Sequence, residues 1–218
     1  MKITNIILDI DGVLLDSTKI MIEFHKKVAK LLGLRVPKDY EISNLWGVSI
    51  EEFIKSLWPD VNMKEYRKFA RKMFNKERIK FPPIKGAKTA LKKLKGLGFK
   101  LSLVTGRRKK YTKKHMKEAG FDLKMFDVII SSEDTEKHKP NPEPIIQACE
   151  LLKIKPEEVV YVGDSLLDYQ SAKRAKVKFV GVLTGDFSEK ELREKGVENI
   201  ITSISELPNF LKVRNWIS

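Results

Sequence analysis

The sequence is poor in cysteine and in glutamine. Its 218 residues contain one cysteine, Cys149, so an internal disulfide bond is excluded and a cysteine-based metal cluster lacks its ligands. Cys149 lies in the apolar helical pattern of residues 145–152, where we expect a buried structural thiol. Glutamine is limited to Gln147 and Gln170 while lysine and glutamate abound, which is typical of thermophile-like surfaces. This composition fits a reducing, cytoplasmic setting.

Long hydrophobic runs are also missing. No apolar run approaches the roughly 20 residues that a membrane helix needs, and the first residues do not resemble a signal peptide. Hydrophobic residues make up 42% of the chain and charged residues 33%, which indicates a soluble globular protein with a packed core. The length allows one large domain, or a core domain with a small insertion.

Positive charge is in excess, and the formal net charge is +14. Such an excess is compatible with nucleic-acid binding. The lysines are nevertheless spread through helical segments such as 90–98 and 111–120, and they do not form one basic tail. We therefore favour solvated charged faces over a nucleic-acid surface. A positive field would also attract anionic substrates, so charge alone does not decide the function.

Short apolar runs alternate with amphipathic segments along most of the chain. This alternation predicts a parallel sheet with helices on both sides, an α/β Rossmann-like three-layer fold. The predicted strands are residues 3–8, 100–104, 127–130, 159–162, 179–182 and 199–201. The predicted helices between them are residues 87–97, 111–119, 143–152, 168–175 and 189–194.

Residues 17–80 interrupt this rhythm, because they show helical patterns and no convincing strand. Gly33, Pro37 and Pro59 separate the helices, and Pro82 with Pro83 ends the segment. We predict a small all-helical cap at 17–80, inserted after the first strand into a catalytic core of residues 1–16 and 81–218. Its aromatic residues fit helix packing better than ligand stacking, and His25 is expected on a helix surface. Examples of these aromatic residues are Phe24, Trp46, Phe53 and Trp58.

Two aspartates follow the first strand. Asp9 and Asp11 fall on the same side of an extended chain, and Gly12 permits a tight turn. A pair of turn-forming aspartates is the alternative. We favour a functional pair, because a charge at the end of a buried apolar strand is costly without a partner.

Polar residues also follow the second and third predicted strands. Thr105 and Gly106 offer a hydroxyl and amides ahead of a helix, and Lys139 begins a proline-rich loop that can hold a fixed positive charge against a phosphate. Each signal is weak alone, since Thr-Gly is an ordinary loop sequence and lysines are plentiful.

The fourth such strand is followed by Asp164, with Asp168 four residues later. Helix capping is an alternative role for these aspartates. In a parallel sheet, however, the carboxyl ends of the strands border one site. Carboxylates, a lysine and a hydroxyl meeting there would hold Mg²⁺ and surround a transferring phosphoryl group.

Four segments resemble the signatures of the haloacid dehalogenase superfamily, and specifically its phosphoglycolate-phosphatase-like and phosphomutase-like branch. They are DIDGVLLDS at 9–17, LVTGR at 103–107, KPNPEP at 139–144 and VGDSLLD at 162–168. The segment 17–80 stands where the family's first cap type is inserted. Asp11 favours phosphoryl transfer, because the halide-releasing members usually lack this acid.

The resemblance implies a role for each matched residue. Asp9 would attack phosphorus and form an aspartyl-phosphate, and Asp11 would act as general acid and then base. Thr105, Gly106 and Lys139 would bind the phosphoryl group. The magnesium site would comprise the Asp9 carboxylate, the Asp11 carbonyl and Asp164, with Asp168 behind them.

The function expected from these residues is a Mg²⁺-dependent phosphatase acting on a small phosphorylated metabolite. A sugar phosphomutase of the same superfamily is one alternative. A binding module for nucleic acid or a phosphorylated ligand, without turnover, is another. We expect a monomer or small homo-oligomer, with neither a membrane nor a nucleic-acid partner.

Overall fold

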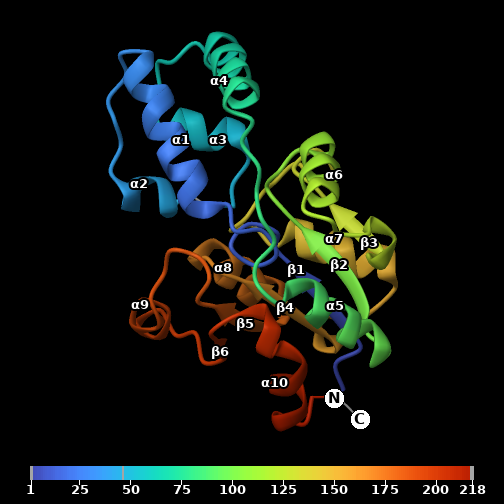
Figure 1. Ribbon diagram of the computed structural model, residues 1–218. Coiled ribbons are helices and arrows are strands. Elements are labelled where there is room, and N and C mark those ends of the chain that lie inside the picture. Colours follow the sequence, from blue (N-terminus) through green and yellow to red (C-terminus); the bar gives the residue numbers. More distant parts are fainter. Residues whose placement is uncertain (1, 46, 217–218) are drawn as a thin grey trace.

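Six parallel strands form a sheet in the order β3-β2-β1-β4-β5-β6 (Figure 1). The computed structural model describes residues 2–45 and 47–216. The strands are β1 Asn5–Leu8, β2 Lys100–Val104, β3 Val128–Ile130, β4 Val159–Gly163, β5 Lys178–Val182 and β6 Ile200–Ile201. Each lies within about two residues of its predicted range. The shortest one, β6, pairs with the edge of β5.

Helices cover both faces of this sheet. They are α5 Ala87–Gly96, α6 Lys109–Glu118, α7 Glu143–Leu152, α8 Leu166–Ala175, α9 Glu189–Glu194 and α10 Leu207–Val213. Side chains alternate along β1, so Ile6 packs with α5, α6 and α10 while Ile7 packs with α7, α8 and α9. Both faces of the strands are therefore buried, and the predicted α/β three-layer fold is confirmed. Cys149 is buried between α7 and the sheet, as expected.

The chain order places β1 at the centre of the sheet. The chain runs from β1 outward through β2 and β3, then returns to the other side of β1 and continues through β4, β5 and β6. The order reverses between β1 and β4, and the crevice beyond the carboxyl ends of such strands is where ligands bind in open α/β sheets. Residues that follow β1 and β4 are thus brought to one edge.

Four helices form the inserted cap above this edge (Figure 1). They are α1 Thr18–Leu31, α2 Asp39–Ser43, α3 Ile50–Leu57 and α4 Met63–Glu77. The short helix α2 was not predicted, because five residues after Pro37 show too little periodicity. The cap has its own hydrophobic core, which includes Phe24, Phe53 and Trp58 as expected; Trp46 lies outside the described residues. The boundaries 17 and 80 stay a prediction.

The prediction for His25 is wrong. Its side chain is buried in the cap core, and Nδ1 lies 2.8 Å from the hydroxyl oxygen of Tyr66. Burial lowers the pKa of His25 to about 3, so the ring is neutral. The surrounding lysines of α1 made the segment look solvent-facing, while the periodicity of Ile22, His25 and Val28 matches the buried stripe.

No helix in the described part of the chain is both long and apolar enough to cross a membrane.

Replacing Tyr66 by phenylalanine tests this buried pair. Tyr66→Phe leaves the His25 nitrogen without its partner in an apolar environment, and we expect the free energy of unfolding to fall by about 1–3 kcal/mol. Urea denaturation measures the change. Tyr40→Phe is the matched control, because Tyr40 is 59% exposed and its loss of a hydroxyl should have little effect. Equal stability of the two variants would contradict a stabilising role for the pair.

Candidate active site

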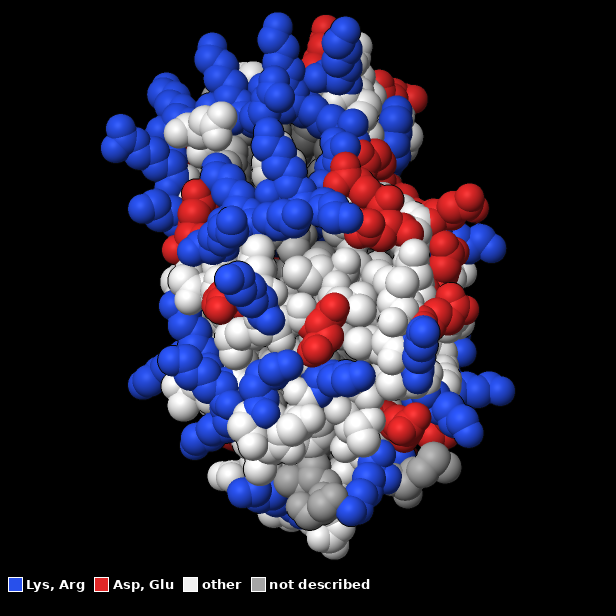
Figure 2. All heavy atoms as spheres, turned by 90° about the vertical axis from the view of Figure 1, so that its right-hand side faces the viewer, with Lys and Arg blue, Asp and Glu red and all other residues white. Residues whose placement is uncertain are grey.

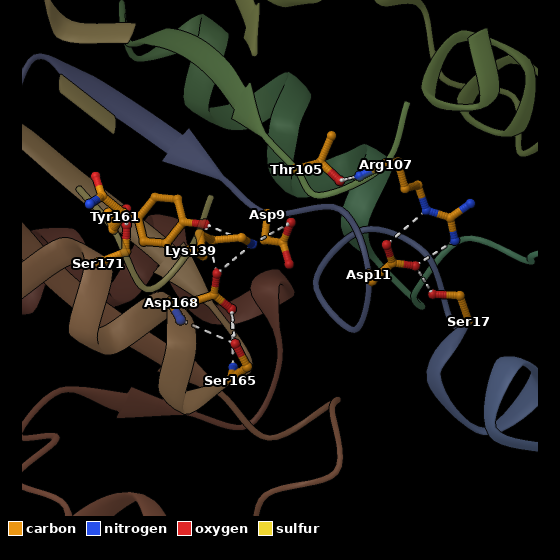
Figure 3. Close-up of polar contacts among 11 residues, drawn as sticks. Asp9, Asp11, Ser17, Thr105, Arg107, Lys139, Tyr161, Ser165, Asp168 and Ser171 are labelled. Carbon is orange, nitrogen blue, oxygen red and sulfur yellow. Dashed lines mark hydrogen bonds and ion pairs between the residues drawn. The ribbon is translucent and has the colours of Figure 1, made fainter. Parts of the chain in front are cut away.

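The loops after β1, β2, β3 and β4 meet at one edge of the sheet (Figure 3). Each contributes a polar side chain, and all four side chains are at least 95% buried. They are Asp9, Thr105, Lys139 and Asp164. The structure therefore brings together residues that lie more than 150 positions apart, at the place that the sheet topology predicts.

Lys139 lies at the centre of the charged contacts. Its Nζ donates a hydrogen bond to Asp168 Oδ1 at 2.7 Å and lies 3.2 Å from Asp9 Oδ1. It also donates to the hydroxyl of Tyr161 at 3.3 Å. Burial opposes the charge of this ammonium group, but Asp168 and Asp9 hold its pKa above the ordinary value. Lys139 is therefore a fixed cation beside the Asp9 carboxylate.

Asp168 both caps a helix and positions this lysine. Ser165 Oγ accepts a hydrogen bond from the Asp168 amide at 3.1 Å, and Asp168 Oδ2 accepts from the Ser165 amide and hydroxyl at 3.2 and 2.6 Å. The other oxygen, Oδ1, accepts from Lys139 and from the Tyr161 hydroxyl at 2.7 Å each. The capping interaction and the contact with Lys139 thus coexist in one residue.

Three carboxylates come close enough to share a cation. Oxygens of Asp9, Asp164 and Asp168 all lie within 4.8 Å of one another. Asp164 Oδ1 is buried, and no described residue donates a hydrogen bond to it. Since both oxygens of Asp168 already have donors, Asp9 and Asp164 are the carboxylates that suit a divalent ion.

The pKa values of the cluster also indicate that these carboxylates need a further positive charge nearby to stay ionised. Burial raises the pKa of Asp9 to about 7 despite the charge of Lys139, and Asp168 and Asp11 add to the increase. Burial, then Asp168 and Asp9, raise the pKa of Asp164 well above its usual range. A hard divalent cation would allow both carboxylates to remain ionised.

Two glycines make room for Asp164. A Cβ atom on Gly12 or on Gly185 would overlap the Asp164 carboxylate. Gly12 also has a positive φ of 65°, which a side chain disfavours. The loops after β1 and β5 can therefore close tightly around this carboxylate.

The Asp11 side chain points away from the acidic cluster (Figure 3). Arg107 donates to both of its oxygens, from Nε at 2.7 Å and from Nη2 at 2.5 Å, and the Ser17 hydroxyl donates to Oδ1. Burial would raise the pKa of Asp11, but Arg107 and Ser17 hold it below the ordinary value. The carboxylate of Asp11, a predicted metal residue, is thus outside the cluster, and its backbone carbonyl stays the predicted ligand.

The cap rests against the edge of the sheet where these side chains meet. Backbone carbonyls of Gly47 and Val48 pack so closely on Gly106 that a Cβ there would lie 2.5 Å from Val48 O. Polar side chains of the described residues also bridge cap and core: the Ser43 hydroxyl donates to Asp186, and Glu52 Oε2 lies 3.3 Å from His138 Nδ1. Gly106 is therefore in direct contact with the cap. Its role in phosphate binding stays a prediction.

Three site residues received no role from the sequence. Arg107 lies within the motif that follows the second strand but looked like one of many basic residues, and Ser17 looked like a helix start. Tyr161 reads as an ordinary strand residue in the run VVYV, although a tyrosine hydroxyl buried in a strand needs a partner, which was a usable signal.

Comparison with known proteins places this arrangement in a family. Residues 6–182 match the model of the haloacid dehalogenase-like hydrolases. A protein of Caldanaerobacter subterraneus subsp. tengcongensis, provisionally named pyrophosphatase PpaX, is 33% identical over 97% of this chain and 96% of its own length. The phosphoglycolate phosphatase of Nitrosospira multiformis is 27% identical over 97% of each chain.

A solved structure agrees. A protein of Bacteroides fragilis, provisionally described as a haloacid dehalogenase-like hydrolase, superposes with a TM-score of 0.80 at 27% identity, over 94% of this chain and all of that one. The fold and site define a hydrolase with a capped α/β core. This chain belongs to the haloacid dehalogenase-like hydrolase family, and the predicted resemblance is confirmed.

Substituting Gly185 tests the geometry around Asp164. In Gly185→Ala the added Cβ displaces the Asp164 carboxylate, and we expect Mg²⁺ to bind about 10-fold to 100-fold more weakly. Isothermal titration calorimetry measures the dissociation constant. Gly96→Ala is the control, because a Cβ at Gly96 has no described atom within 4 Å. Unchanged Mg²⁺ affinity in Gly185→Ala would show that Asp164 does not hold the ion.

Proposed function

We propose that this protein is a Mg²⁺-dependent phosphatase that hydrolyses a small phosphorylated metabolite through an aspartyl-phosphate at Asp9. The observation that carries the proposal is the buried carboxylate of Asp9, which faces the Lys139 ammonium at 3.2 Å and shares a cluster with Asp164. A carboxylate nucleophile divides one difficult displacement at phosphorus into two easier ones.

Asp9 and Asp164 would hold the magnesium ion, with the carbonyl of Asp11 as a further oxygen ligand. The undonated Asp164 oxygen and the raised pKa values of both acids fit an oxygen-binding dication. When bound, Mg²⁺ neutralises charge on the transferring phosphoryl group. Lys139, which Asp168 and Tyr161 hold in place, would neutralise further charge on this group.

Asp11 lies two residues beyond the nucleophile on the same loop, and it would serve as general acid for the leaving group and then as base for water. To do so, its carboxylate must leave Arg107 and Ser17 and turn toward Asp9. Thr105, next to Arg107 at the end of β2, would hydrogen-bond a phosphoryl oxygen, and the backbone of Gly106 would bind phosphate beside it.

The cap supports a small substrate. Its loop packs on Gly106, and the small cavity beneath is lined by Gly47 of the cap with Thr105 and Lys139 of the core. A cap in this position excludes bulk water from the phosphoryl group. Phosphoglycolate and inorganic pyrophosphate, for which two relatives are named, are the first substrates to test.

A sugar phosphomutase shares the same core residues. The two activities separate by product, because a mutase returns the phosphoryl group to the sugar and a phosphatase releases inorganic phosphate. Incubation with a hexose 1-phosphate, analysed for both products, is the test. Predominant isomerisation would replace the phosphatase by the mutase.

Removing the nucleophile tests the role of Asp9. Asp9→Asn should lower the hydrolysis of p-nitrophenyl phosphate by more than about 1,000-fold. Asp16→Asn makes the same charge change at an exposed position of the same loop and should keep activity. EDTA should abolish wild-type activity, and added Mg²⁺ should restore it. Retained turnover in Asp9→Asn would contradict the nucleophile assignment.

Removing the acid–base group tests the second half-reaction. Asp11→Asn should slow hydrolysis of the aspartyl-phosphate by about 100-fold to 10,000-fold, so phosphorylated Asp9 accumulates. Acid quenching followed by mass spectrometry of the Asp9 peptide detects it. Equal hydrolysis rates in the variant and the wild type would rule out this role.

A further inference from the structure

Arg107 is an arginine at the site edge with an unusually constrained environment. Its guanidinium packs over the ring of Phe81 at 4.5 Å, its Nη1 donates to His115 Nδ1 at 2.5 Å, and its side chain is 14% exposed. Burial lowers the pKa of His115 to about 3, so this ring is a neutral acceptor. The guanidinium is thus held rigidly. Its two other nitrogens, Nε and Nη2, both donate to Asp11 and form a fork around the carboxylate.

The fork geometry is the geometry with which arginine binds any carboxylate or phosphate. In this structure the anion in the fork is the Asp11 carboxylate, whose oxygens are also bonded by Ser17. Arg107 and Ser17 bind both Asp11 oxygens here, so action on a leaving group would require Asp11 to exchange these partners. If Asp11 left without a replacement, Arg107 would lose its anionic partner in a largely buried site, which is unfavourable.

A substrate can supply the replacement. We propose that Arg107 is a specificity-determining residue, which binds a second anionic group on the leaving-group side of the substrate and thereby releases Asp11. The substrate class is therefore a phosphate ester or anhydride whose leaving group carries a carboxylate or a further phosphate. This inference rests on the proposed phosphatase function and narrows its substrate.

The surroundings favour such a doubly anionic substrate. Figure 2 shows lysine and arginine side chains gathered over the cap and along its border with the sheet domain. Helices α4 and α6 carry exposed basic residues, among them Lys68, Arg71, Lys72, Lys110 and Lys113. Their field attracts a substrate more strongly as its negative charge increases.

The wild-type enzyme gives the first test. Phosphoglycolate and ethyl phosphate differ by a carboxylate in place of a methyl group, so their kcat/KM values isolate the second anion. We expect kcat/KM for phosphoglycolate to be about 10-fold to 100-fold higher, because a charge-assisted hydrogen bond contributes a free energy of that size. Pyrophosphate, assayed in parallel, shows whether a phosphate can fill the same position.

Variants assign the preference to Arg107. In Arg107→Gln the preference for phosphoglycolate should be lost, because kcat/KM should fall more for phosphoglycolate than for ethyl phosphate. General structural damage would lower the kcat/KM values for both substrates by the same factor. Arg107→Lys should give an intermediate preference, since it keeps the charge and loses the fork. A fall in pyrophosphate turnover in Arg107→Gln would extend the assignment to a phosphate as the second anion.

Arg108→Gln is the matched control. It removes the same charge from the adjacent residue, which is 45% exposed and pairs with Glu133 on the surface. Its substrate preference should equal that of the wild type. If Arg107→Gln does not fold, the inference is tested by the ratio of kcat/KM for phosphoglycolate to that for ethyl phosphate, measured in the wild type and in Arg107→Lys.

The inference is overturned if the wild type releases phosphate from both substrates with less than about a 3-fold preference, or if Arg107→Gln keeps the wild-type ratio. Phosphate release without that preference leaves the proposed function intact. Absence of phosphate release from every substrate contradicts the proposed function, and the inference falls with it.

Discussion

The site is built around a deficit of positive charge. Three buried carboxylates, Asp9, Asp164 and Asp168, surround one ammonium group, that of Lys139. An uncompensated buried charge costs about 3–5 kcal/mol, so this set of acids is stable in its ionised form when a further cation is present. The fixed lysine answers part of this demand, and the proposed metal ion and nucleophile would depend on the same electrostatic constraint.

The sheet makes the constraint possible. Because β1 lies between β2 and β4, residues at the ends of these strands are neighbours although their loops are far apart in sequence. Gly12 and Gly185 allow two of these loops to approach Asp164 without a side chain between them. The inserted cap then covers the edge with backbone groups that pack on Gly106. Architecture and charge are therefore coupled in the same few loops.

Much of this could be predicted from the sequence, because continuous apolar runs mark buried parallel strands and the residues after them mark the active edge. Asp9, Thr105, Lys139 and Asp164 were found in this way. The direction of a side chain could not be predicted. Whether Asp11 faces Asp9 or Arg107 depends on partners that are 96 residues apart in the chain. The prediction for His25 was wrong for the same reason, since its partner Tyr66 belongs to another helix of the cap.

A crystal structure of the wild-type protein with Mn²⁺ in place of Mg²⁺ tests the central claim most directly. Anomalous scattering locates the manganese independently of the protein coordinates. We predict one strong peak in contact with both the Asp9 and the Asp164 carboxylates. A fully occupied ion bound elsewhere, or no peak between these two residues at saturating Mn²⁺, would contradict it.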